Sequence, residues 1–145
     1  MAGPRWKAGR TGRIDLDHEW AIGSMVGNEV AASNLEEARR LAARVEQASF
    51  QLWWEAAFAE KRGDRAAARE ATEPYAAKYG GIYPFAVAEL HAIVGEPDLA
   101  FEWLDRSFSQ REPDLRGLTY EEWFRPLHGD PRWKALLKKM NLPAD

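Results

Sequence analysis

The stretch GEPDLAFEWLDRSF, residues 95–108, decides the fold of this 145-residue chain. Gly95 suits the left-handed residue that closes one helix, and Pro97 suits the first turn of the next, where its missing N–H costs nothing. Small and apolar side chains then recur at helical spacing, at Leu99, Ala100, Trp103, Leu104, Ser107 and Phe108. The pattern predicts two helices joined by a tight turn.

Similar signals predict three earlier helices. Two of them lie upstream, and the third is the helix that ends at Gly95. Gly63 closes a helix that carries Phe50, Trp53, Trp54, Ala57 and Phe58, and Asp64 suits the N-cap of a helix over residues 65–79. Pro74 lies inside that helix, and we expect it to kink or split the helix. Gly80 and Gly81 then break it. The helix that ends at Gly95 is lined by Val87, Leu90 and Val94, with Phe85 and Ala88 beside them.

The N-terminal third is less regular. The pairs Ser33–Glu36 and Asn34–Glu37 have the spacing of capping boxes, so we expect a helix from Leu35 to about Ser49, with Glu36 one turn before Arg40. The stretch LDHEWAIGSMVGNEVA, residues 16–31, is ambiguous because Gly23 and Gly27 weaken a helix. Its apolar face as a helix would be formed by Leu16, Trp20, Met25 and Val26.

Residues 119–145 are predicted to close the domain. Thr119–Glu122 has capping-box spacing and would open a short helix through Trp123 and Phe124. Asp130-Pro131 opens a last helix, whose apolar stripe is Trp133, Leu136, Leu137 and Met140. No segment has the alternation of a strand, so the predicted fold class is all-α.

An internal repeat links these helices. Ala38, Ala68 and Ala100 follow similar turns at nearly equal intervals, both slightly short of the tetratricopeptide period of about 34 residues. A small residue is needed where two helices cross closely. From about residue 49 to 143 the chain resembles tetratricopeptide repeat proteins, most clearly over residues 95–108. The tail FRPLHGDPRWKALLKKM, residues 124–140, looks like the closing segment of repeat arrays in bacterial regulators. Departures from the family pattern are Pro84, His91 and Ser107.

The resemblance implies antiparallel helix pairs stacked as a short right-handed solenoid over residues 14–145, with a C-terminal helical cap. It implies a non-catalytic module that binds a protein or peptide on the concave surface lined by the first helix of each pair. On this chain that surface comprises Phe50, Trp53, Ala57, Lys61, Ile82, Phe85, Glu89 and Ile93. A homodimer is a further expectation. The alternative is a small-molecule-binding or enzymatic helical domain with a Trp-lined pocket.

Composition excludes several classes of function. The chain has no Cys, so disulfides, thiolate metal sites and Cys nucleophiles are absent. It has no Gly-rich phosphate loop or nucleophile elbow. The pairs considered as acid–base catalysts, Glu55 with Glu60 and Glu89 with His91, follow from ordinary helical composition. We therefore expect no enzyme and no cofactor.

Charge and hydropathy bear on the partners. Net charge is −3, and the basic residues of MAGPRWKAGRTGR are interpreted as a flexible tail, residues 1–13, rather than a nucleic-acid arm. The cluster Asp15, Asp17, His18 and Glu19 is considered as a metal site and interpreted as a solvated first helical turn. No apolar run reaches the roughly 20 residues that a membrane helix needs. We expect a cytoplasmic protein.

Overall fold

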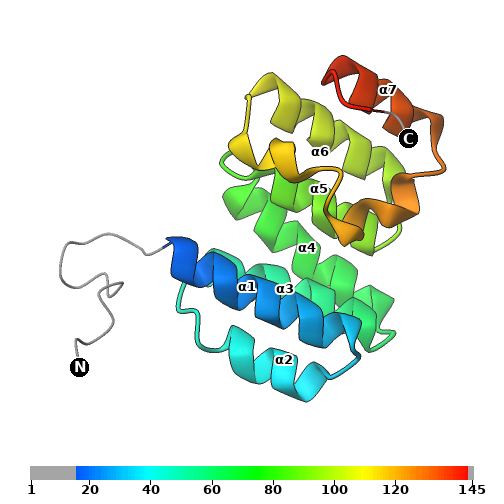
Figure 1. The fold of residues 1–145 in the computed structure, drawn as a ribbon. Helices are drawn as coiled ribbons and strands as arrows, with labels where there is room; N and C mark the ends of the chain where they lie inside the picture. Colours follow the sequence, from blue (N-terminus) through cyan, green and yellow to red (C-terminus); the bar gives the residue numbers. More distant parts are fainter. Residues whose placement is uncertain (1–15, 144–145) are drawn as a thin grey trace. The chain divides into compact units, whose positions relative to one another are not determined.

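The structure is a computed structural model that describes residues 16–143. Every regular element in this range is helical and none is a strand, so the all-α prediction is confirmed. The elements are α1 (Leu16–Ala31), α2 (Leu35–Ala42), α3 (Ala48–Lys61), α4 (Arg65–Tyr79), α5 (Pro84–Ile93), α6 (Pro97–Ser109), the 3-10 helices η2 (Pro113–Gly117) and η3 (Glu122–Leu127), and α7 (Pro131–Lys139) (Figure 1). The predicted tail, residues 1–13, lies outside the described residues.

The turns that join α1 to α2, α3 to α4 and α5 to α6 have the same backbone geometry. Each contains one residue with positive φ: Ser33 (62°), Gly63 (83°) and Gly95 (78°). The N-cap residue that follows donates its N–H to the carbonyl five residues back, over 2.8, 2.9 and 2.8 Å in chain order. Its ψ is 70, 76 and 73°. This hydrogen bond is the one that defines a Schellman turn. Three α-hairpins therefore share one kind of turn.

The three hairpins also share a buried alanine. Ala38, Ala68 and Ala100 are each the fourth residue of their helix, and each is 0% exposed. Each donates its N–H to the carbonyl of its N-cap residue over 3.0 Å. The repeat seen in the sequence is therefore also a repeat of local structure. In each hairpin the fourth residue of the second helix is an alanine with no exposed surface, so a larger side chain would not fit there without rearrangement.

The chain divides into two compact units, Met1–Trp54 and Glu55–Asp145, with the boundary inside α3. In the first unit α1 packs along α2. The stretch that was ambiguous in sequence is one helix, and its buried stripe is Ile22, Val26 and Val30. Met25 was predicted to lie on that stripe and is instead exposed. The buried residues Ile22, Val26 and Val30 are spaced four apart, and Met25 lies one residue before Val26, outside this series. The side chains of Leu16 and Trp20 lie outside those described.

The predicted length of α2 is wrong, because the helix ends at Ala42 rather than near Ser49. The Gln51 amide donates to the carbonyls of Ala42, over 2.9 Å, and of Val45. A side chain from α3 thus satisfies the backbone groups that a longer helix would have paired. Arg40 bonds Glu37, over 2.7 and 2.5 Å, instead of the expected Glu36.

Neither predicted capping box forms at the start of α2. Ser33 is the positive-φ residue of the preceding turn, so it cannot be the N-cap. Asn34 is the N-cap, but its side chain makes no capping bond and donates to Glu29 Oε2 over 3.0 Å. The start of α2 is therefore held by the turn that precedes it.

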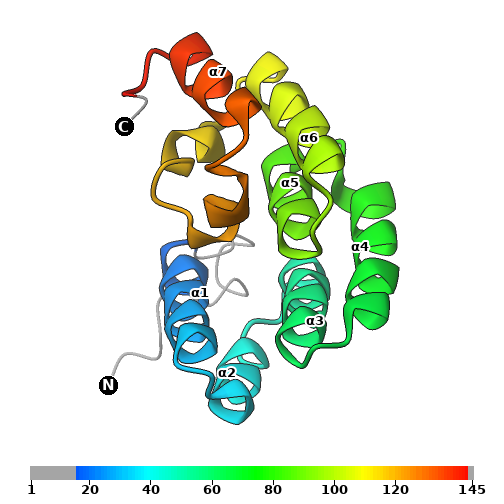
Figure 2. The same ribbon diagram turned by 90° about the vertical axis from the view of Figure 1, so that its right-hand side faces the viewer.

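In the second unit α5 lies between α4 on one side and the two 3-10 helices on the other (Figure 2). The main core of this unit joins α5, α6, the 3-10 helices and α7; its buried side chains are Phe85, Ala88, Ala92, Ala100, Phe101, Leu104, Leu115, Leu118, Phe124, Leu127, Trp133, Leu136 and Leu137. A smaller cluster joins Ala59, Ala68 and Val94. Gly80 lies under the Trp103 ring, and an added Cβ would come within 2.7 Å of it.

Three further expectations for this unit are wrong in whole or in part. Of the kink or split expected at Pro74, the split does not occur, because α4 is one helix from Arg65 to Tyr79 with the proline exposed. Leu99 is exposed, and Phe101 is buried in its place. Thr119 does not cap a helix, because the helix that follows is the 3-10 helix η3 with Glu121 as its N-cap.

Candidate functional site

Of the predicted binding residues in the first unit, Phe50 is half-buried and Trp53 is buried. Adjacent residues on a helix point about 100° apart, so one neighbouring layer could hardly bury Trp53 and Trp54 equally. Both side chains are nonetheless almost inaccessible, at 9% and 6% exposed. Their rings meet edge to face with centroids 4.8 Å apart, and Phe50 packs on Trp54 at 6.1 Å. The contact between the two rings contributes to their burial.

The predicted binding residues of the second unit do not form one exposed surface. Ala57 and Phe85 are buried, and Glu89 and Ile93 are half-buried. Lys61 is exposed, and Ile82 is 64% exposed. Phe85 therefore cannot touch a partner unless the chain around it moves, whereas Ile82 can.

Phe85 and Glu89 are covered by the chain itself. We call residues 112–127, which contain η2 and η3, the covering segment; it lies along α5 (Figure 2). The Phe85 ring meets the Phe124 ring edge to face, with centroids 5.2 Å apart. The Phe85 N–H donates to Glu112 Oε1 over 2.8 Å. The α5 face that the resemblance assigned to a partner is thus occupied by the protein's own C-terminal part.

Several carboxyl groups of this unit act on one another. The charges of Glu121, Asp114 and Glu112 all act on Glu89, which lies on α5. Removal from water and these carboxylates, Glu121 first, raise the pKa of Glu89 well above its usual value. We call Glu89, Glu112, Asp114 and Glu121 the carboxyl cluster.

Glu112 fastens the start of the covering segment. Its Oε1 accepts hydrogen bonds from the Phe85 N–H and from the Ser107 hydroxyl, each over 2.8 Å. Its Oε2 is buried and has no hydrogen-bond partner among the described residues. Burial raises the pKa of Glu112, although the two hydrogen bonds act in the opposite direction. Oε1 therefore links α5 to α6, whereas Oε2 is buried without a hydrogen bond, which is unfavourable.

Tyrosines line the α4 side of the cluster. Tyr75 is buried, and burial followed by the charge of Glu89 raises its pKa. The Tyr75 and Tyr79 rings lie 5.1 Å apart, and the Tyr79 and Tyr83 rings lie 6.3 Å apart. Both groups therefore keep their protons to a higher pH than usual, and while protonated each can donate a hydrogen bond.

The carboxylates considered for catalysis have other partners. Glu60 bonds Arg65 over 2.6 Å, and the Nδ1 of His91 lies 3.2 Å from Glu96 Oε1. Where side chains are described, no group of three or more His, Asp or Glu residues is placed to hold a metal ion. The candidate metal residues Asp15, Asp17, His18 and Glu19 have no described side chains.

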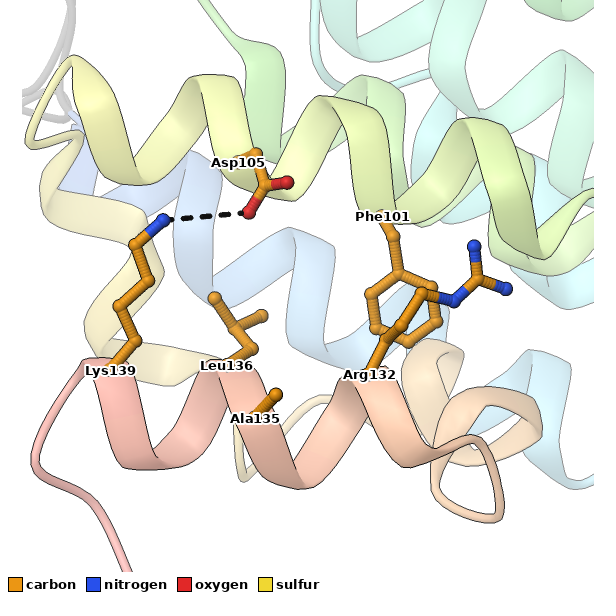
Figure 3. A pocket seen from close by; sticks show the side chains of 6 residues that line it. All are labelled: Phe101, Asp105, Arg132, Ala135, Leu136 and Lys139. Atoms are coloured by element: carbon orange, nitrogen blue, oxygen red, sulfur yellow. Dashed lines mark ion pairs between the residues drawn. The ribbon is translucent and has the colours of Figure 1, made fainter.

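A small pocket of about 170 Å³ lies between α6 and α7 (Figure 3). It is lined by Phe101, Asp105, Arg132, Ala135, Leu136 and Lys139. Both cations have partners: Lys139 lies 3.8 Å from Asp105, and Arg132 bonds Asp98 and Asp130, each over 2.8 Å. The Arg132 guanidinium holds the pKa of Asp130 down to about 2. The pocket contains no tryptophan, so it does not match the Trp-lined pocket of the alternative hypothesis.

Comparisons with protein-family models, curated proteins and solved structures found no match to this chain. No helix within residues 16–143 is long and apolar enough to span a bilayer.

Glu89 was singled out from the sequence, but its neighbours in the cluster were not. Glu112 and Glu121 come after α6 in the sequence, so no helical periodicity relates them to α5. One signal was present, because Glu89 is the only acidic residue in the α5 sequence PFAVAELHAI, in which every other residue except His91 is apolar. A single carboxyl in such a helix indicates a buried polar partner.

Proposed function

We propose that the protein is a non-catalytic interaction module whose α-hairpins are related in structure to tetratricopeptide repeats, and that it binds a protein or peptide. The observation that carries the proposal is the recurrence of one turn and one buried alanine in three hairpins. Repeats of this kind stack to bury a continuous core and leave one face for partners.

Fewer residues of the predicted binding surface are exposed than the sequence suggested. Ile82 is the most exposed large apolar side chain of the predicted set, and Lys61 is exposed as well. An exposed isoleucine stabilises the monomer little, so it is available as an apolar contact for a partner. Self-association through the same surface stays a prediction, and sedimentation of the purified chain measures it.

Affinity capture from native lysate tests the proposal with a matched pair of variants. Ile82→Asp places a charge on the predicted partner surface, and Leu99→Asp makes the same change at an exposed leucine on α6. We expect Ile82→Asp to lose at least tenfold of the captured partner, about 1.4 kcal/mol of binding, and Leu99→Asp to retain it. Urea unfolding of both variants controls for stability. Equal capture by the two variants would contradict the assignment of the surface.

A further inference from the structure

The pocket between α6 and α7 is a groove with an apolar floor and a charged group at each end (Figure 3). The floor consists of Phe101 and Leu136, which are buried, and of Ala135, which is exposed at the edge. These side chains come from both helices, so an apolar group that enters the groove touches α6 and α7 together.

The two ends of the groove differ in how firmly their cations are held. At one end the Arg132 guanidinium is bonded to two aspartates, each over 2.8 Å, and its Cζ lies 4.6 Å from the centroid of the Phe101 ring. At the other end the Lys139 Nζ lies 3.8 Å from Asp105 Oδ1, which is longer than a hydrogen bond. Both side chains of this second pair are at least half exposed, at 50% and 67%. An exposed pair of this kind contributes little, so Lys139 keeps donors for a carboxylate from outside.

The charges around the groove favour an acidic partner. The α7 sequence PRWKALLKK contains four basic residues and no acidic one. Three aspartates contact two of these four cations, so one positive charge is left in excess. The other two cations, Lys134 and Lys138, are exposed and form no ion pair with another described residue. A carboxylate that approaches α7 is therefore attracted.

The size of the groove suits one aliphatic side chain. Its volume is about 170 Å³, and apolar cavities of about 150 Å³ hold a molecule as large as benzene. Leu136 and Lys139 are separated by about 4.5 Å along the helix axis. In an extended peptide, side chains two residues apart point the same way and lie about 7 Å apart. The flexible lysine side chain can span the difference.

We propose that the groove between α6 and α7 binds an extended acidic peptide of a partner protein. An aliphatic side chain of the peptide packs over Phe101 and Leu136, and a carboxylate two residues away pairs with Lys139. Ile82 does not line this groove, so the site goes beyond the proposed function and does not rest on it.

An NMR titration of the isotope-labelled full-length chain tests the proposal. The probe is a pentapeptide with blocked ends that has leucine at its second position, glutamate at its fourth and glycine elsewhere. We expect the signals of Ala135 and Leu136 to shift saturably. Replacement of the peptide leucine by alanine is expected to weaken binding about fivefold or more, because less apolar surface is buried. Replacement of the glutamate by glutamine is expected to weaken it about two- to fivefold, as for an exposed ion pair.

Two matched pairs of variants locate the site. Ala135→Phe fills the groove from its edge and is expected to weaken binding about tenfold, whereas Ala66→Phe makes the same change at an exposed position on α4 and is expected to leave it unchanged. Lys139→Met keeps an apolar side chain of similar length and is expected to bind the glutamate and glutamine peptides equally. Lys134→Met removes a cation that does not line the groove and is expected to keep the preference for glutamate.

Three results would overturn the proposal. The first is the absence of saturable shifts at Ala135 and Leu136, or an unchanged affinity in Ala135→Phe. The second is a preference for the glutamate peptide that persists in Lys139→Met. The third is a shift of the same signals with protein concentration when no peptide is present, because it would assign the groove to a second copy of the chain.

Discussion

Truncation of Phe124 measures how firmly the covering segment belongs to the core. The side chain is fully buried and packs against the rings of Phe85 and Trp133, with centroids 5.2 and 6.0 Å away. A buried Phe removes about 150–250 Å² from water, which at about 25 cal/mol per Å² is roughly 4–6 kcal/mol as an upper bound. Phe→Ala substitutions in cores cost about 3–5 kcal/mol. We expect Phe124→Ala to lose a similar free energy of unfolding.

Urea unfolding followed by far-UV circular dichroism gives this free energy. Domains have about 5–15 kcal/mol in total, so the expected loss is a large fraction of the stability. Tyr120→Ala is the matched control, because it truncates an aromatic residue of the same segment that is 86% exposed, and its change is expected to stay within about 0.5 kcal/mol. A loss below about 1 kcal/mol for Phe124→Ala would refute the conclusion that the segment is part of the core.

Two other matched pairs probe local packing and capping. Gly80→Ala places a Cβ against the Ala76 carbonyl oxygen and within 2.7 Å of the Trp103 ring, whereas Gly81→Ala meets no atom within 4 Å; we expect the first to lose about 1–3 kcal/mol of unfolding free energy and the second to lose none. Equal effects of the two substitutions would show that the backbone and the Trp103 ring leave room for a Cβ at residue 80. Asp64 accepts a hydrogen bond from the Ala67 N–H, whereas the Asn34 side chain makes no cap bond; thermal unfolding should show a loss of about 1 kcal/mol for Asp64→Ala and a smaller loss for Asn34→Ala.

The helical elements were predictable where turn residues mark them. Gly63 and Gly95 adopt the positive φ expected of them, and Asp64 and Asp130 cap the helices that follow. These signals are local, because each depends on the conformational range or the hydrogen bond of one residue. The fold class and most helix boundaries therefore followed from the sequence.

Features that depend on distant contacts were not predictable. The end of α2 at Ala42 depends on a hydrogen bond from Gln51 in the next helix, and the predicted continuation to Ser49 ignored that contact. The covering segment conceals Phe85 because Phe124, which lies beyond α6 in the sequence, packs on it. The family pattern assigned Phe85 to a partner and contains no information about that contact. The carboxyl cluster was missed for the same reason, since only Glu89 lies on a helix with a readable pattern.

The central claim is that one hairpin unit recurs, with a small residue where its second helix packs closely. The most direct test is the free energy of unfolding of Ala68→Leu and Ala100→Leu, measured beside Ala66→Leu. Ala66 is an exposed residue on the same helix as Ala68. We predict losses of about 1–3 kcal/mol at each buried alanine and almost none at Ala66. Buried-site variants as stable as Ala66→Leu would contradict the claim.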